Sequence, residues 1–300
     1  MITHQHAQSQ PPARVVLLGA GGFIGTAVCG QLTEKNIPVK APPSAELNLA
    51  ETSAADKLAE LLKPSDAVVM LAAITSRKEK DCDATIRINN LLKNLVIMQN
   101  VRTAIEKSDC AHLVYFSSDA VYNPAVSRVT EDTPACPQSF YGAMHCTREI
   151  MARSLARVPV LVLRPTMVYG FENADNSNVL NRFCRSAHKC GRIELSDGEG
   201  MRDHIHVDDV ARLTVRCLLN KSIGTLNVAT GISRSFYDVA KIVKKQFGNR
   251  IDINSKRSDK PITQRHYDVT NLIKAFPDFR FIAPEDGIAR VHHQMIEAAR

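Results

Sequence analysis

The segment Gly19-Ala20-Gly21-Gly22-Phe23-Ile24-Gly25 constrains the fold of this chain more than any other feature of its sequence. It follows a short apolar, β-branched run at residues 15–18 and precedes a helical pattern at residues 26–34. In this G-x-x-G-x-x-G spacing, the first glycine permits a tight turn, the second lets the backbone approach a pyrophosphate, and the third lets helix pack on strand. Free N–H groups at the start of a helix favour phosphate. The segment therefore predicts a dinucleotide site.

Strand and helix patterns alternate from residue 14 to about residue 165. Further buried strands are predicted at residues 67–73, 112–117 and 158–164, with a weak strand at residues 37–40. Because parallel strands need crossover connections, the alternation predicts a Rossmann-type α/β fold with a doubly wound parallel sheet. Ligands of such sheets bind beyond the carboxyl ends of the strands. Beyond residue 165, loops and helical patterns at residues 179–189, 207–220, 236–247 and 288–299 predict a smaller C-terminal substrate-binding region.

The domain boundaries follow from these patterns. Residues 1–13 are polar and rich in Gln, Ser and Pro, so we expect a disordered tail without the features of an export signal. Residues 14–169, with about residues 204–232, are expected to form the NAD(P)-binding domain. Residues 170–203 and 233–300 are expected to form the substrate-binding region. No apolar run approaches the roughly 18 residues that a membrane span needs.

The charge balance favours an anionic partner. Lys and Arg number 38 against 31 Asp and Glu, a net charge of +7, which suits nucleic acid, a phosphorylated metabolite or an acidic membrane surface. Aromatic residues are only 5% and Trp is absent, which disfavours a protein that binds single-stranded nucleic acid by stacking. No nucleic-acid-binding motif occurs in the sequence. The eight cysteines contain no CxxC and are expected to be thiols of a reducing cytoplasm. Cys184, His188 and Cys190 match no common zinc spacing, so we predict no metal site.

The end of the second strand bears on the choice of dinucleotide. An NAD site usually has an acidic residue there for the ribose hydroxyls, whereas a 2′-phosphate needs a cation. Here the strand ends at Lys40, and no acid follows until Glu46. This pattern favours NADP over NAD, with Lys40 as the phosphate partner. The alternative is that Lys40 only faces solvent.

A series of ordered segments carries a family resemblance. They are Gly19 to Gly25, Leu71-Ala72-Ala73, Phe116-Ser117-Ser118-Asp119-Ala120-Val121-Tyr122, Tyr141-Gly142, Arg164-Pro165-Thr166-Met167-Val168-Tyr169-Gly170, Arg202-Asp203-His204-Ile205-His206-Val207-Asp208-Asp209 and Asn227-Val228-Ala229-Thr230-Gly231. Over roughly residues 14–240 the chain resembles the extended short-chain dehydrogenase/reductase family. This family contains nucleotide-sugar epimerases, dehydratases and ketoreductases.

The resemblance implies a cofactor site, a nucleotide-sugar substrate and a homodimer. The implied cofactor-binding residues are Gly19, Gly22, Phe23, Ile24, Gly25, Lys40, Asn48, Leu49, Leu71, Ala72, Ala73, Asn89, Ser117, Tyr141, His145 and Pro165. Asn48 would contact the adenine. Ser118, Asn178 and Arg202 would hold the substrate, Arg202 at its phosphates, although Asn178 is equally suited to cap a helix. The dimer would form through helices at about residues 89–105 and 141–157.

The same resemblance assigns the chemistry. Tyr141 would exchange a proton with the sugar hydroxyl, and Ser118 would hydrogen-bond the same oxygen. The family normally has Lys four residues after the Tyr, to lower the pKa of the phenol and bind the nicotinamide ribose, but this chain has His145. Either His145 takes the Lys role as a cation, or it only packs or hydrogen-bonds the ribose. Asp119-Ala120 replaces the Asp-Glu pair of family dehydratases, which disfavours dehydration.

The sequence therefore predicts a cytoplasmic, NAD(P)-dependent nucleotide-sugar epimerase or 4-ketoreductase that feeds a polysaccharide or glycan pathway. Its chemistry would be hydride transfer at a sugar carbon, with Tyr141, Ser118 and His145 as catalytic residues. The alternative is a non-catalytic protein of the same fold that binds a dinucleotide or a nucleotide sugar, in which His145 marks lost activity.

Overall fold

A computed structural model describes residues 2–75, 83–171, 178–195, 200–248, 250–255 and 263–300; Cys82 lies outside these ranges. The chain forms two compact units. The first comprises residues 1–123, 131–165 and 210–228, and the second comprises residues 124–130, 166–209 and 229–300. Two segments expected in the first unit, residues 124–130 and 166–169, belong to the second. The later segment of the first unit comprises residues 210–228, where about residues 204–232 were expected.

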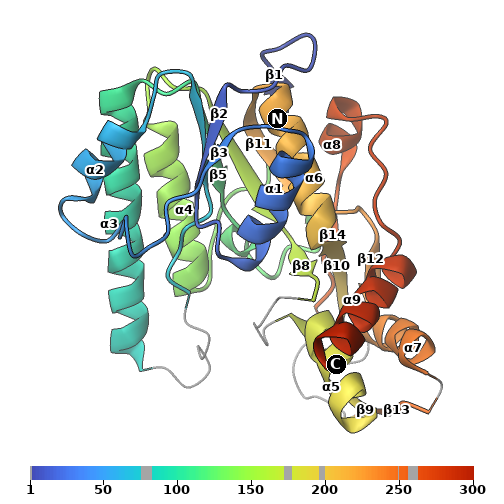
Figure 1. Cartoon of the computed structure of the whole chain (residues 1–300). Coiled ribbons are helices and arrows are strands. Elements are labelled where there is room, and N and C mark those ends of the chain that lie inside the picture. Colours follow the sequence, from blue (N-terminus) through green and yellow to red (C-terminus); the bar gives the residue numbers. More distant parts are fainter. Residues whose placement is uncertain (1, 76–82, 172–177, 196–199, 249, 256–262) are drawn as a thin grey trace. The chain divides into compact units, whose positions relative to one another are not determined.

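The first unit is built on a seven-stranded sheet with the order β1-β11-β7-β5-β4-β2-β3 (Figure 1). Its strands are β1 (Ile2–His4), β2 (Arg14–Leu18), β3 (Val39–Lys40), β4 (Asp66–Met70), β5 (His112–Phe116), β7 (Val160–Pro165) and β11 (Ser222–Val228). All pairings are parallel except that of β1 with β11. This sheet confirms the predicted doubly wound α/β fold. The chain adds β3 on one side of β2 and then β4 on the other, so the strand order reverses between β2 and β4.

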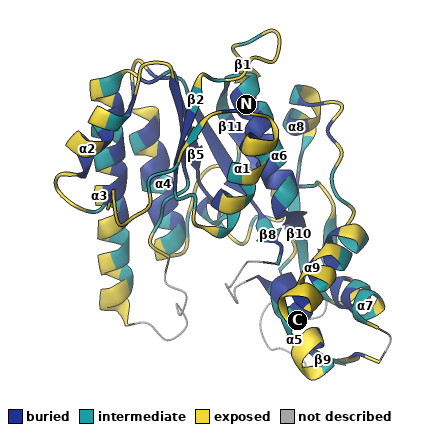
Figure 2. Ribbon diagram, in the orientation of Figure 1, coloured by how far each residue is buried: buried dark blue, intermediate teal, exposed yellow. Residues whose placement is uncertain are grey.

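Helices cover both faces of this sheet. They are α1 (Phe23–Glu34), α2 (Ala54–Leu61), α3 (Ala84–Ser108), α4 (Phe140–Arg153) and α6 (Val207–Leu219), with a short 3₁₀ helix η1 (Asp119–Val121). Helices α2, α3 and α4 lie on one face, and α1 and α6 on the other (Figure 1). Strand residues such as Val68 and Leu113 pack against Leu58, Met98 and Ala152 of the covering helices. The central strands β4 and β5 are buried along their whole length (Figure 2), as parallel strands between two helical layers must be.

The N-terminal segment differs from the predicted disordered tail. Residues 2–4 form β1 at the edge of the sheet, and Ile2 is buried there. His4 Nδ1 lies 2.8 Å from Ser222 Oγ, and His6 Nδ1 lies 3.2 Å from the Leu219 carbonyl oxygen. The pairing partner is about 220 residues away in the chain, so local composition gave no sign of it. The polar side chains are compatible with β1 because an edge strand needs only one covered side.

The second unit combines small sheets with a helical layer. Its sheets have the orders β12-β10-β8, β13-β9 and β14-β6. The strands are β6 (Arg128–Val129), β8 (Met167–Tyr169), β9 (Arg192–Leu195), β10 (Met201–His206), β12 (Ser233–Ser235), β13 (Asp252–Ser255) and β14 (His266–Tyr267), and the helices are α5 (Val179–Cys190), α7 (Phe236–Phe247), α8 (Thr270–Ala275) and α9 (Pro284–Ala298). Phe183, Val239, Val243 and Ile288 form the core between α5, α7 and α9. None of the helices described in either unit is long and apolar enough to cross a membrane.

Candidate functional site

A cavity of about 580 Å³ opens at the carboxyl ends of β2, β3 and β4, where the strand order of the first unit reverses. Its walls come from residues 18–22, 41–44, 47–49 and 71–74, together with Ile97 of α3. Reversal points are the usual ligand sites of open parallel sheets, and this volume lies in the range of small-molecule and cofactor sites. The predicted glycine loop is therefore one wall of a cavity of cofactor size.

The backbone of the glycine loop fits a bound pyrophosphate. Gly19 has φ +97°, and a Cβ atom there would lie 2.7 Å from the Ala72 backbone nitrogen. A side chain is thus excluded both by backbone conformation and by the neighbouring strand end. Gly22 is the N-cap of α1, and no side chain caps that helix terminus. A dinucleotide bound here would meet the free N–H groups and the positive end of the α1 dipole.

The predicted cofactor residues are distributed unequally around this cavity. Gly19, Gly22, Asn48, Leu49, Leu71, Ala72 and Ala73 line it. Phe23, Ile24 and Gly25 form the first turn of α1 just behind the loop, and Pro165 is buried at the end of β7. Lys40 is exposed at the end of β3, immediately before the lining residues 41–44. Asn48 holds its own turn, since its Oδ1 accepts from Ala50 N and its Nδ2 donates to Glu51.

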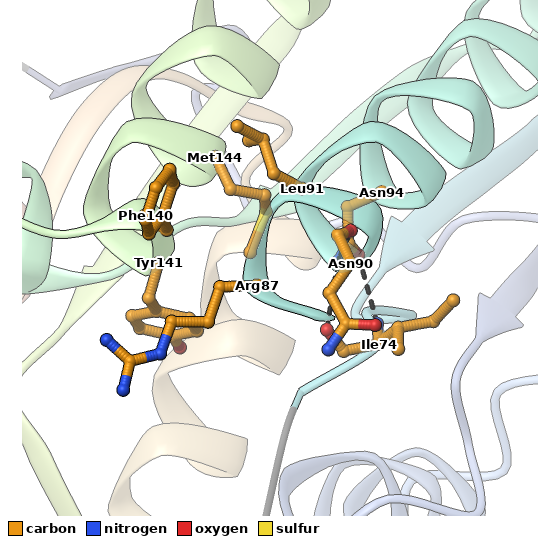
Figure 3. A pocket seen from close by; sticks show the side chains of 8 residues that line it. All are labelled: Ile74, Arg87, Asn90, Leu91, Asn94, Phe140, Tyr141 and Met144. Carbon is orange, nitrogen blue, oxygen red and sulfur yellow. Dashed lines mark hydrogen bonds between the residues drawn. The ribbon is translucent and has the colours of Figure 1, made fainter. Parts of the chain in front are cut away.

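The wall that follows β4 is fixed by a residue that the sequence analysis missed. Asn94 of α3 is 1% exposed, and its amide accepts from Ile74 N and donates to Ile74 O, both at 2.9 Å. Ile74, Asn94 and the neighbouring Asn90 also line a second, smaller pocket between α3 and α4, which Figure 3 shows. Asn89, the predicted cofactor residue, is exposed and lines neither this pocket nor the glycine-loop cavity. Helix phase decides this outcome, because adjacent residues of α3 point about 100° apart.

A close approach of two backbones places Tyr141 beside the Ser118 segment. Ser139 caps α4, so Tyr141 lies in its first turn, and a Cβ atom on Gly142 would lie 2.2 Å from Ala120 O. The start of α4 therefore rests directly on η1, whose N-cap is Ser118. Ser118 Oγ accepts from Ala120 N at 3.2 Å. The structure thus brings these two predicted catalytic residues to adjoining segments of the first unit.

Ser117 points into the interior instead. Its hydroxyl donates to Glu149 Oε1 at 2.5 Å, and Glu149 accepts two hydrogen bonds from Arg164 of β7. Arg164 also donates to Tyr122 Oη at 2.8 Å. This buried ion pair ties α4 to β5 and β7. Any contact of Ser117 with a cofactor would therefore be made by its backbone.

His145 is buried and neutral. It is 4% exposed, its Nδ1 lies 2.8 Å from Tyr115 Oη, and the Tyr141 ring meets it edge-on with 4.6 Å between centroids. Burial, aided by the charge of Arg148, lowers the pKa of His145 to about 3. An imidazolium in the Lys role is therefore disfavoured at neutral pH. These contacts agree with the packing role that the sequence left open, and the hydrogen bond goes to Tyr115.

In the second unit, Arg202 lines a cavity of about 270 Å³ together with His204, Arg234 and mainly aliphatic side chains. Arg202 donates to Thr263 O at 2.9 Å and to Thr263 Oγ1 at 2.5 Å. Arg202 and Arg234 are direct cross-strand partners on β10 and β12, an arrangement of like charges that an anion would stabilise. Asn178 caps α5, accepting from Leu180 N and Asn181 N, and donates to Val168 O. The structure thus gives Asn178 the helix-cap role.

The loop at Thr230 and Gly231, which leads into β12, is held by a buried carboxylate. Asp203 accepts from the backbone of Thr230 and Gly231 at 3.1 and 2.7 Å, and from the Thr230 hydroxyl at 2.9 Å. Burial raises the pKa of Asp203 to about 6, against the lowering effect of these hydrogen bonds. The Arg-Asp-His sequence thus alternates across β10, with Arg202 and His204 lining the cavity and Asp203 anchoring the loop.

A doubly wound parallel sheet with a glycine loop at the reversal of its strand order is typical of dinucleotide-binding proteins. Comparison with known proteins gives the family. Residues 15–229 match the model of the NAD dependent epimerase/dehydratase family, and the chain belongs to that family.

Known sequences and structures resemble this chain at low identity. A GDP-6-deoxy-D-talose 4-dehydrogenase from Aggregatibacter actinomycetemcomitans is 24% identical over 271 residues, 87% of each chain. The structure of a GDP-D-glycero-L-gluco-heptose synthase from Campylobacter jejuni, solved in the presence of NADPH, matches with a TM-score of 0.81 at 19% identity, covering 97% of this chain and all of the other. The Thermus thermophilus UDP-glucose 4-epimerase in complex with NAD matches with a TM-score of 0.78 at 20% identity, covering 95% and 99%.

Proposed function

We propose that this protein is an NAD(P)-dependent nucleotide-sugar epimerase or 4-ketoreductase that transfers a hydride at a sugar carbon. The observation that supports the proposal is the packing of α4 on η1, because the segments that carry Tyr141 and Ser118 adjoin in the same unit as the glycine-loop cavity. The names of the relatives, which act on GDP- and UDP-linked sugars, support the substrate class.

The residues of the chain have separate tasks in this reaction. Tyr141 Oη takes the proton of the sugar hydroxyl, or returns it to the carbonyl oxygen, and Ser118 Oγ hydrogen-bonds the same oxygen. Arg202 would bind the substrate phosphates. A bound nicotinamide would supply the hydride chemistry. Gly19, Gly22 and the start of α1 would hold the pyrophosphate of the dinucleotide, and residues 47–49 and 71–73 would surround the rest of it.

The choice between NADP and NAD is part of the proposal. We assign NADP, because Lys40 is an exposed cation at the rim of the lining segment 41–44 and no acidic residue stands there. Replacement of Lys40 by Gln is expected to weaken NADPH binding and to leave NADH binding unchanged. An equal loss for both cofactors would show that Lys40 does not read the 2′-phosphate.

The test is turnover with substrates of both kinds. The purified chain is given GDP-6-deoxy-D-talose and NADP⁺, and NADPH formation is followed at 340 nm; UDP-glucose without added nicotinamide is assayed in parallel for its epimer. Tyr141→Phe is expected to abolish the observed activity, a loss of 100-fold or more, because the proton then has no carrier. The matched variant Phe140→Tyr, one residue away on α4, tests whether any disturbance of this turn has the same effect. Cofactor binding without turnover of any nucleotide sugar would favour the non-catalytic binding protein.

A further inference from the structure

Arg148 of α4 is a buried cation that the reaction outlined above does not use. It is 1% exposed and ranks among the largest fully buried side chains that the structure describes. Residues 141, 145 and 148 are spaced by four and three, so they lie along one face of α4. That face packs on Tyr115 of β5, and the Arg148 guanidinium lies over the Tyr115 ring, 5.3 Å from its centroid.

Within the described part of the chain, the hydrogen-bond acceptors around the guanidinium are neutral. Arg148 Nη2 donates to Ala72 O at 2.9 Å, and Nη1 lies 3.5 Å from Asn94 Oδ1 and 3.6 Å from Met144 Sδ. Glu149, the adjacent carboxylate, faces the other way, where it is paired with Arg164 and Arg153. A buried charge without a carboxylate partner is costly, and such charges concentrate at functional sites.

The groups that feel this charge are phenols and an imidazole. Arg148 acts electrostatically on Tyr115 and on Tyr141, and it helps to keep His145 neutral. His145 fills the space between the two tyrosines, with its Nδ1 at Tyr115 Oη and its ring against Tyr141. Among the described residues, two cations therefore act near Tyr141: Arg148 on its own helix, and Arg87, which lines from α3 the small pocket that Tyr141 also lines (Figure 3).

We propose that Arg148 is the permanent positive charge that makes the Tyr141 phenol acidic enough for proton exchange, with His145 a neutral spacer that fixes the Tyr141 ring. This role rests on the proposed function, in which Tyr141 exchanges the proton. Arg148 acts through Tyr141 and is therefore a positioning residue. Its hydrogen bond to Ala72 O also fixes the cavity wall beside the glycine loop.

Arg148 and a protonated His145 predict different pH dependences of the activity. A guanidinium stays protonated throughout the range in which proteins are stable, whereas an imidazolium would lose its charge near pH 6.5. With Arg148 as the cation, activity rises as Tyr141 ionises and shows no loss between pH 6 and 8. A charge on His145 would instead produce a decline across that interval.

The experiment measures the ionisation of Tyr141 directly, without turnover. The absorbance at 295 nm is titrated with pH for the full chain and for its Tyr141→Phe variant in saturating NADP⁺, and the difference reports Tyr141. Arg148→Gln retains a donor for Ala72 O but removes the charge, and is expected to move the midpoint up by about one pH unit or more. Arg148→Lys restores the charge and is expected to titrate near the original midpoint.

Three further variants make the outcome decisive. His145→Gln keeps a hydrogen-bonding group at Tyr115 and is expected to leave the Tyr141 midpoint within about 0.3 units of its original value. Arg157→Met, an exposed arginine paired with Asp109, is the matched control for loss of one positive charge. The proposal is overturned if Arg148→Lys titrates like Arg148→Gln, or if His145→Gln or Arg87→Met shifts the midpoint instead. Because the titration needs no substrate, an inert wild type would refute the proposed function and leave this measurement valid.

Discussion

Three buried histidines are expected to make the stability of the folded chain depend on pH. Burial lowers the pKa of His112 and His204 to about 4 and that of His145 to about 3. An unfolded chain would protonate each of them near pH 6.5, so between that pH and the folded pKa the unfolded state binds more protons. Their stabilising contribution is therefore present above pH 6.5 and is lost as the pH falls.

The two units should differ in this response. In the second unit, the pKa of Asp203 is raised to about 6, so the folded state takes up a proton there more readily than the unfolded state does. His204 has the opposite effect, because its pKa is lowered. The two contributions to the pH dependence of the unfolding free energy therefore offset each other. In the first unit, His112 and His145 act together, each worth about 2 kcal/mol at pH 5. We expect the unfolding free energy of the first unit to fall by several kcal/mol between pH 7 and pH 5.

Urea unfolding followed by circular dichroism at both pH values measures this loss. His145→Gln is expected to remove about half of the pH dependence of the first unit. A stability that does not change between pH 7 and pH 5, or a His145→Gln variant with the full dependence, would contradict the assignment of neutral buried histidines.

At the scale of elements, α3 and α4 carry an unusual set of exposed apolar side chains. Ile88, Leu92 and Val96 recur every four residues on α3 and are 43%, 54% and 40% exposed, and Ile150 of α4 is 66% exposed. The helices adjoin, since Arg102 of α3 donates to Ser154 at the end of α4. Repeated apolar residues on one helix face indicate a surface that another helix covers. If the chain forms the homodimer that the resemblance implies, this face is the expected contact.

The corresponding prediction is that Leu92→Glu combined with Ile150→Glu converts a dimer into a monomer, because each carboxylate would be buried in the contact. Light scattering coupled to size-exclusion chromatography gives the mass directly. Ile273→Glu, at a 54% exposed isoleucine of α8, provides the matched control and should leave the mass unchanged. A wild-type chain that is monomeric at micromolar concentration would show that the apolar face has another use.

Local patterns and long-range contacts explain which elements the sequence could predict. The glycine loop and the buried strands were predictable because their turn chemistry and apolar runs are encoded within a few residues. Strand β1 was not, because its pairing partner is β11, and the short strands of the second unit carry little periodicity of their own. In the candidate site, Tyr141 and Ser118 were found from motifs. Asn94 and Arg148 were missed because their roles depend on Ile74, Ala72 and Tyr115, which are distant in sequence.

At the scale of the whole molecule, the proposed function assigns the phosphates of its two anionic ligands to different units. The net charge of +7 suggested an anionic partner without saying where it binds. The glycine-loop cavity belongs wholly to the first unit, and the cavity with Arg202 and Arg234 belongs wholly to the second. A change in one cavity should therefore weaken one ligand and spare the other.

This division predicts that two substitutions each weaken the binding of a different ligand. Gly19→Ala places a Cβ atom 2.7 Å from Ala72 N at a φ of +97°, and should weaken NADPH binding at least tenfold while GDP binding is retained. Arg202→Gln removes charge-assisted hydrogen bonds to phosphate, worth about 1.5–3 kcal/mol, and should weaken GDP binding roughly 10- to 100-fold while NADPH binding is retained. Gly30→Ala, in α1 with no atom within 4 Å of the added carbon, should change neither affinity. Isothermal titration of each variant with NADPH and with GDP measures all six affinities, and a loss of both ligands in either variant would show that the two cavities do not act independently.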